Sequence, residues 1–336
     1  VGSDGPVWRS LLDLDCILVG GVRGYGKTTF LFSALLALLQ QHSPHELQVA
    51  IVDPKGFDFA LFDGLPHLWT ERVTSAEGAA PLLSDLVAEM EDRGEQFARL
   101  GVRALEAFNQ ASPEQLPLLL VVVDEVTDLM LEAGRQAAAL QRSLVRLVSK
   151  GRAAGILLLV ATQNPKSEVF STLARGNFKT RIAFWVSEAV MSRTILNRGG
   201  AEQLPQVQGR MLALIEGQSQ EPLELQGFYL SDEAIKATLA GLADRPYSRL
   251  TDLERSLVRY AAGQLAGEFK IEGLYEAFRG RISKRKLTTL AQVWERRGWL
   301  TAPQHRADPR RVTEKLLKEA GRGVEAAEVS PEGKFR

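Results

Sequence analysis

Five short apolar runs are spaced along the first two thirds of the chain, and polar or amphipathic segments separate them. The runs cover residues 16–20, 47–56, 116–126, 156–163 and 178–186. Each predicts a strand, and the third is apolar almost throughout, as expected for a strand that is covered on both faces of a parallel sheet. The pattern therefore predicts an α/β fold with a mostly parallel, doubly wound sheet.

Amphipathic segments between these runs predict the helices that cover the sheet. Residues 79–101 carry apolar side chains at helical spacing, mostly on one face, and residues 138–155 form a second helical pattern closed by glycine. In such a fold, ligands bind where the carboxyl ends of the strands meet. Four polar segments follow predicted strand ends at that edge, namely residues 21–28, 53–55, 124–125 and Gln163.

The first of these segments, in GGVRGYGKTT, matches the P-loop pattern G-x-x-x-x-G-K-[ST] between a predicted strand and a predicted helix. Loop N–H groups and the helix N-terminus favour phosphate at this place, whereas a chance glycine-rich turn is the alternative. We expect Lys27 to reach the β- and γ-phosphates of ATP and Thr28 to bind Mg²⁺. The predicted nucleotide-binding residues are Gly21, Gly24, Gly26, Lys27, Thr28 and Thr29.

The third run ends in two carboxylates, Asp124 and Glu125, after six apolar residues. This is the Walker B arrangement, which supports hydrolysis when it is paired with a P-loop. We expect Asp124 to orient Mg²⁺ and Glu125 to take a proton from the attacking water. Gln163, at the tip of the fourth run, is a candidate contact to the γ-phosphate or its water, and a structural role is the alternative.

Composition adds limits to this picture. The 336 residues are 45% hydrophobic and 24% charged, which suits about two globular domains. The single cysteine, Cys16, excludes an internal disulfide and cysteine-rich zinc sites and fits a cytoplasmic protein. No apolar run reaches about 18 residues, so we expect no membrane span and no signal peptide. Because the chain begins with Val rather than Met, an anchor upstream of it stays open.

Charge is distributed unevenly although the formal net charge is zero. Residues 249–323 hold 17 Lys and Arg against 9 Asp and Glu, a net charge of +8, so the rest of the chain carries −8. A basic C-terminal module indicates a nucleic-acid partner, with a solvated basic face as the alternative. We divide the chain into a domain at 1–231, a linker at 232–248, a basic module at 249–302 and a helical or disordered tail at 303–336.

The basic module shows three helical patterns, at residues 250–267, 271–278 and 282–300, and a strand-like segment follows. Ser283 is the expected N-cap of the third helix. Three helices and a strand resemble a winged helix-turn-helix, whose third helix lies in the major groove of DNA. The expected DNA contacts at the start of this helix are Lys284, Arg285 and Lys286. A small helical domain that binds protein is the alternative.

Several stretches, in order, resemble FtsK/SpoIIIE-type DNA translocases of the HerA–FtsK superfamily. They are VDPKGFDFALFDGLPHL, LVAEMEDR, VVVDEVTDLM, KGRAAGILLLVATQNP and TRIAFWVSEAVMSRTILNRGGAEQL, within residues of about 15–230. The resemblance implies a RecA-like ATPase and a hexameric ring, with ATP at subunit interfaces and double-stranded DNA through the centre. It also implies that Arg152 completes the neighbouring subunit's site, where a guanidinium stabilises charge on the transferring phosphoryl group. Arg181 and Arg193 are the alternatives, and Arg152 would then only cap its helix.

The sequence departs from the family at a few positions. Asn164 stands where the family usually has Arg in T-Q-R-P, and Lys166 is the candidate that replaces this charge in contacting DNA. Val126 and Thr127 replace the usual Phe-Ala, and Arg210 stands where an acidic residue is usual. None of these departures removes a residue that hydrolysis requires.

Three functions agree with these motifs. The leading one is an ATP-driven translocase of chromosome, plasmid or phage DNA. The second is a type VII secretion ATPase that moves polypeptide, although such proteins usually string several motor domains together and lack a winged helix. The third is a DNA-binding regulator that uses ATP only as a switch, and the intact Asp124 and Glu125 argue against it.

Overall fold

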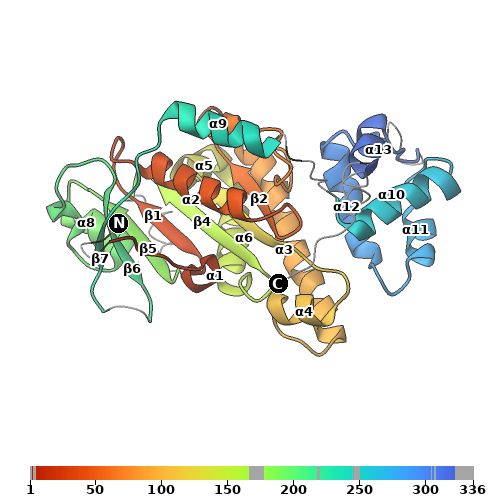
Figure 1. The fold of residues 1–336 in the computed structure, drawn as a ribbon, viewed down its shortest axis with the longest axis horizontal. Coiled ribbons are helices and arrows are strands. Elements are labelled where there is room, and N and C mark those ends of the chain that lie inside the picture. Colours follow the sequence, from red (N-terminus) through yellow and green to blue (C-terminus); the bar gives the residue numbers. More distant parts are fainter. Residues whose placement is uncertain are drawn as a thin grey trace, which may run out of the picture.

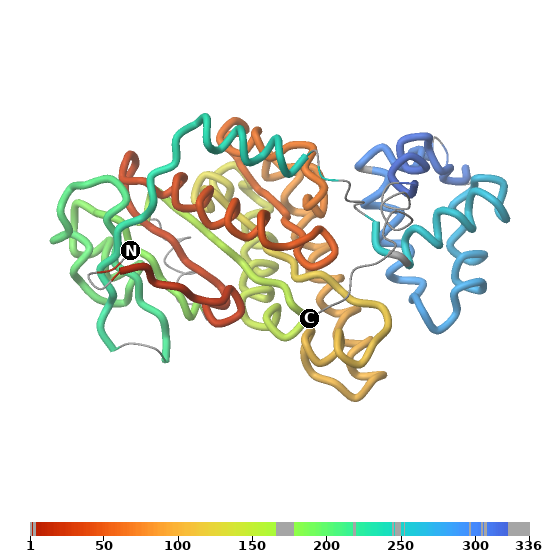
Figure 2. Tube along the Cα trace, in the orientation of Figure 1, coloured from red at the N-terminus to blue at the C-terminus, as the bar shows by residue number. Residues whose placement is uncertain are grey.

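The computed structural model describes residues 2, 5–165, 178–217, 220–243, 245, 250–303, 305 and 308–321. They form an α/β domain and a smaller helical domain built from the C-terminal part of the chain (Figure 1). The trace in Figure 2 shows the helical domain beside the part of the first domain that contains α3. Within these residues, no helix combines the length and the apolar character needed to cross a bilayer.

A seven-stranded sheet crosses the first domain in the order β2-β3-β4-β1-β5-β6-β7. Its strands are β1 (Ile17–Gly20), β2 (Leu47–Val52), β3 (Leu118–Val123), β4 (Ile156–Thr162), β5 (Thr180–Phe184), β6 (Arg210–Ile215) and β7 (Leu223–Gln226). The first five strands are parallel, and β6 and β7 add antiparallel at one edge. The prediction of a mostly parallel, doubly wound sheet is confirmed.

Helices cover both faces of the sheet, which is why the parallel strands are almost entirely buried. One face packs against α3 (Ala76–Arg99), α5 (Val126–Ala133) and α6 (Ala137–Lys150). The other packs against α2 (Lys27–Gln41) and α9 (Asp232–Ala243). Neighbouring strand residues alternate between the faces, so Leu18 joins the first cluster and Val19 the second.

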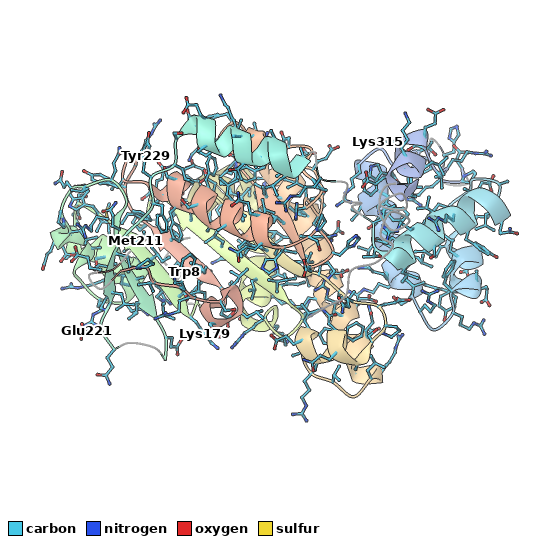
Figure 3. All side chains as sticks on the ribbon, viewed as in Figure 1. Trp8, Lys179, Met211, Glu221, Tyr229 and Lys315 are labelled. Atoms are coloured by element: carbon cyan, nitrogen blue, oxygen red, sulfur yellow. The ribbon has the colours of Figure 1, made fainter. Side chains whose placement is uncertain are left out.

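Short helical segments occupy the connections of this domain. They are α1 (Leu11–Leu14), η1 (Ala60–Phe62), α4 (Leu105–Ala111), η2 (Gly134–Gln136), α8 (Ala189–Leu196) and η3 (Ala201–Gln203). Two aromatic side chains of this domain are strongly exposed, Trp8 at 76% and Tyr229 at 87%. Figure 3 labels both in parts of the domain that lie apart from the helical domain, so that domain does not cover them.

The helical domain packs its apolar side chains into a cluster that continues onto the α3 face of the first domain. Its helices are α10 (Asp252–Gln264), α11 (Ile271–Ala277), α12 (Lys284–Arg296) and α13 (Glu314–Gly321). Trp294 and Trp299 are buried and stack edge to face with centroids 6.2 Å apart. Ser283 caps α12, as predicted, by accepting a hydrogen bond from the Lys286 amide. Among the described residues, β-structure here consists of isolated antiparallel bridges such as the one between Leu300 and Val312.

Two segments that the sequence placed outside the domains pack onto them. Helix α9, in the predicted linker, buries Ile235 and Leu239 on the α2 face of the sheet. Helix α13, in the predicted tail, buries Leu316 and Ala320 in the helical domain. The antiparallel strands β6 and β7 were not predicted, because β6 is only half-buried in alternation and β7 has no fully buried residue.

Candidate functional site

The carboxyl ends of four parallel strands bring the predicted catalytic segments together. Gly20, which leads into the P-loop, lies opposite Thr162 at the end of β4, and β3 runs beside β4 into Asp124 and Glu125. Strand β2 ends beside β3 at Val52. Residues separated by more than a hundred positions therefore meet at one edge, as the parallel sheet requires.

The P-loop glycines hold conformations that side chains would not tolerate. Gly26 has φ of +98°, and a Cβ on it would lie 2.9 Å from the Gly209 nitrogen. Gly21 leaves no room either, since its Cβ would lie 2.7 Å from the Phe184 Cβ. The loop is thus closed over the sheet edge and turns its backbone toward the N-terminus of α2.

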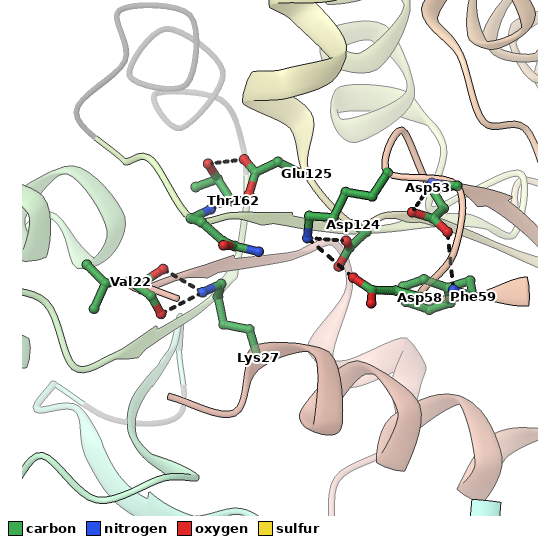
Figure 4. A network of polar contacts seen from close by, with 12 residues as sticks. Val22, Lys27, Asp53, Asp58, Phe59, Asp124, Glu125 and Thr162 are labelled. Carbon is green, nitrogen blue, oxygen red and sulfur yellow. Dashed lines mark hydrogen bonds and ion pairs between the residues drawn. The ribbon is translucent and has the colours of Figure 1, made fainter. Parts of the chain in front are cut away.

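Lys27 lies inside this loop. Its Nζ donates to the Gly21 oxygen at 2.6 Å and to the Val22 oxygen at 2.9 Å (Figure 4). Burial lowers the pKa of Lys27 to about 8, and the Glu125 and Asp124 carboxylates oppose that shift. The ammonium is therefore held among loop carbonyls beside the carboxylates, where the phosphates of a nucleotide would meet it.

A pocket of about 620 Å³ opens beside the loop. It gathers most of the predicted nucleotide-binding residues, Gly24, Gly26, Lys27, Thr28 and Thr29, together with Gln163. Lys55 and Asp58, from the turn after β2, line the opposite wall. The pocket thus joins the P-loop, the second strand end and the fourth strand end, which is the arrangement that the sequence predicts.

Asp124 is buried and forms an ion pair with a lysine of the same chain. Lys55 donates to Asp124 Oδ2 at 2.9 Å and reaches Asp58 at 3.4 Å (Figure 4). Burial raises the pKa of the Asp124 carboxyl, and the Lys55 ammonium opposes the rise. The Asp124 carboxylate and the Thr28 hydroxyl are hard oxygen ligands of the kind that Mg²⁺ prefers, so these residues fit that ion.

Glu125 is held by the end of β4. Thr162 donates its hydroxyl hydrogen to one carboxylate oxygen at 2.7 Å, and the Gln163 amide donates to the other at 2.5 Å. The Thr127 hydroxyl lies 2.9 Å from that of Thr162, so Thr127 enters the network where the family usually has Ala. Burial raises the pKa of the Glu125 carboxyl against these hydrogen bonds. A carboxylate with a raised pKa is suited to accepting a proton.

Lys55 and Thr162 are the two site residues whose roles the sequence did not assign. Both follow or end predicted strands at the ligand-binding edge, which was the available signal. Asp53, in the same turn as Lys55, has a structural role instead, because its oxygens accept hydrogen bonds from the Gly56 and Phe59 amides. Arg210, another departure from the family, pairs with Glu224 on the adjacent strand β7.

Arg152 lies far from the pocket of its own subunit. It precedes β4, whereas Gln163 follows it, and the seven residues of β4 separate the two ends by about 23 Å. Its side chain is half exposed and its Nε lies 3.5 Å from the Asp15 carboxylate. Of the alternatives, Arg181 is buried and donates to the Ile195 oxygen, whereas Arg193 is exposed on α8.

The three cations predicted to contact DNA are all paired with carboxylates. Lys284 pairs with Glu272 at 2.6 Å within the helical domain. Arg285 pairs with Glu91 and Lys286 with Glu89, both on α3 of the first domain. Lys166, the fourth predicted DNA contact, lies outside the described residues.

Comparison with known proteins agrees with this geometry. Residues 2–167 match the FtsK/SpoIIIE family. The chain is 41% identical to the DNA translocase SftA of Bacillus subtilis over 69% of its own length and 24% of that protein. It is 31% identical to the DNA translocase FtsK of Listeria monocytogenes over 90% of its length and 42% of that protein. The chain thus spans less than half the length of these curated relatives.

Two solved structures have folds similar to that of this chain. The pCW3 conjugation coupling protein TcpA, in its monomer form with ATPγS, superposes with a TM-score of 0.64 at 26% identity, over 72% of this chain and 69% of that chain. The type VII secretion ATPase EccC of Thermomonospora curvata has a TM-score of 0.58 at 24% identity, over 73% of this chain and 30% of that one. The likeness to EccC concerns the fold alone.

Proposed function

The chain carries an FtsK/SpoIIIE-family ATPase domain, and we propose that it is the motor of an ATP-driven translocase that moves double-stranded DNA. The observation that carries this proposal is that Lys27, which lines the P-loop pocket, lies within electrostatic reach of the Asp124 and Glu125 carboxylates. The similarity to SftA and FtsK, whose names describe DNA translocases, supports DNA as the substrate.

Different residues of the chain take the separate roles that ATP hydrolysis in this pocket requires. The P-loop amides and Lys27 bind the phosphates. Thr28 and Asp124 would hold Mg²⁺, which would neutralise charge on the β- and γ-phosphates. Glu125, oriented by Thr162 and the Gln163 amide, accepts the proton of the attacking water. Lys55 and the metal would share the Asp124 carboxylate, whose Oδ2 atom the Lys55 ammonium contacts at 2.9 Å.

In a ring of subunits, hexameric as the family resemblance implies, a neighbouring subunit supplies a guanidinium to the pocket. Arg152 lies at the end of β4 opposite to the pocket of its own chain, about 23 Å along the strand, so it acts on a neighbouring subunit's nucleotide. Its half-exposed side chain, which pairs with Asp15, is accessible for that contact. This arrangement requires an interface between the amino ends of the strands of one subunit and the P-loop of the next.

The helical domain is the DNA-docking module of this motor, with a winged-helix character. Its net charge of about +5, from 11 basic and 6 acidic residues in 249–302, supports a polyanionic partner. The alignment with Listeria FtsK, which covers 90% of this chain, extends into it. Lys284, Arg285 and Lys286 are its phosphate contacts, and Lys166 is a further one on the motor.

The decisive experiment measures ATP turnover of the full chain with and without duplex DNA, together with its mass in solution with nucleotide. We expect turnover that rises with duplex length, a ring in the presence of ATP, and ATP-dependent displacement of a triplex-forming oligonucleotide from a duplex track. Lys27→Ala is the control, since it removes the phosphate cation. Turnover that duplex DNA leaves unchanged, in a preparation that forms rings, would contradict the DNA substrate.

A further inference from the structure

The amino-terminal end of α12 makes a group of polar contacts to α3 of the first domain. Besides Arg285 and Lys286, the Ser283 hydroxyl donates to Asp92 Oδ1 at 2.7 Å. Just ahead of the helix, Arg281 pairs with Glu114 of the first domain. Figure 1 shows α12 on the side of the helical domain that faces α3, with α10 and α11 farther away.

Glu89 of α3 is a buried carboxylate that takes part in this contact between the domains. Its carboxylate is only 2% exposed and has two cations, Arg93 on α3 and Lys286 on α12. Arg93 donates through Nε to Glu89 and through Nη1 to the Pro117 and Ala154 carbonyls. Burial opposes ionisation of Glu89, but Lys286 and Arg93 outweigh it and lower its pKa to about 2. A buried carboxylate needs such partners, and α12 supplies one of them.

The start of α12 also lacks the acidic side chain that a helix N-terminus favours. Its first turn holds no Asp or Glu, whereas the partial positive charge of that end prefers anions. The carboxylates of α3 provide them, because Glu89, Glu91 and Asp92 all bond to residues of this first turn or its cap. Cations at a helix N-terminus are also the groups that would bind DNA phosphates.

We propose that the amino-terminal end of α12 is an interaction surface which, in the absence of DNA, binds the acidic face of α3 (Glu89, Glu91 and Asp92) in the same chain. Duplex DNA must displace this acidic face to reach the same cations. A cavity of about 340 Å³ between the domains is lined in part by Glu89 and Lys286, and the Arg285–Glu91 pair of the same contact is partly exposed to solvent. Ion pairs that water reaches are weakened and can exchange partners. The exchange with DNA rests on the proposed function, whereas the docking on α3 does not.

The test compares two lysines of the same helix turn in the full chain. Lys286→Met removes a cation that reaches α3, and Lys284→Met removes one that pairs with Glu272 inside the helical domain. Docking is followed by energy transfer between fluorophores on cysteines introduced at Arg99 of α3 and Thr288 of α12, both exposed; Cys16 is buried. Without DNA, Lys286→Met should shift the equilibrium toward the undocked state about tenfold, and Lys284→Met should leave it within about twofold.

The exchange is tested with Glu91→Gln, which weakens the acidic face at a partly exposed position and should not endanger folding. We expect saturating duplex DNA to lower the energy transfer of the wild type, and Glu91→Gln to tighten duplex binding by about threefold to tenfold, since apparent affinity scales with the undocked fraction. Energy transfer that duplex leaves unchanged while DNA is bound, or equal effects of the two lysine variants, would overturn the proposal. If no duplex binds at all, the proposed function and the exchange fail together, while the lysine comparison still decides the docking.

Discussion

Glu125→Gln is the substitution whose consequences the structure specifies in most detail. The carboxylate uses both oxygens, one accepting from the Thr162 hydroxyl and one from the Gln163 amide. A Gln side chain offers a single acceptor oxygen, so one donor loses its partner, at a cost of about 1–3 kcal/mol. Replacing a buried carboxylate by a neutral amide removes its desolvation penalty and offsets part of this cost.

We therefore expect a net destabilisation of about 1–2 kcal/mol, which lowers the melting temperature of a domain this size by about 2–8 °C. Turnover should fall much further, by about 10²–10⁴, because the amide cannot accept the proton of the attacking water. ATP binding should persist, since the P-loop and Lys27 are unchanged.

The assay combines steady-state ATPase rates, binding of a fluorescent ATP analogue and thermal melts. Asp128→Asn is the matched control, because it changes a carboxylate that lines the same pocket, on the exposed side of α5, without touching the Thr162 network. Turnover of Glu125→Gln within about threefold of the wild type, with a normal melt, would assign the general base to another group and refute this reasoning.

Three further predictions follow from the structure. Lys27→Ala and Arg152→Ala should each be nearly inactive alone, and mixing them should restore part of the ATPase rate; no recovery despite proven co-assembly would exclude a guanidinium supplied in trans. Lys55→Met should lower the free energy of unfolding of the nucleotide-free protein by about 2 kcal/mol, because buried Asp124 loses its cation. Mg²⁺-ATP should bring the melting temperatures of Lys55→Met and the wild type closer together. The depressed pKa of Glu89 stabilises the folded state at pH values above about 4.5, its pKa in the unfolded chain, and this stabilisation is lost as pH falls toward about 2. The free energy of urea unfolding should therefore be higher for the wild type than for Glu89→Gln by a constant amount near pH 7, and this difference should shrink from pH 4 to pH 3.

Local sequence determined the elements around the nucleotide site. Each buried parallel strand reads as an apolar run, and the P-loop glycines are required by the backbone conformation of the loop itself, as the left-handed φ of Gly26 shows. Because carboxyl ends of parallel strands share one edge, recognising the strands was enough to place Lys27, Asp124 and Gln163 near one another. The Ser283 cap of α12 was also predictable from local sequence, because its hydrogen bond joins residues only three positions apart.

Tertiary structure alone decided the partners of residues that lie far apart in the chain. No local pattern indicates that Lys55 meets Asp124 sixty-nine positions later, or that Lys286 meets Glu89 on another domain. The basic start of α12 reads as a DNA contact in the sequence because an isolated turn shows only its own charges. The carboxylates that neutralise it come from α3, nearly two hundred residues earlier, and only the packing of the two domains brings them together.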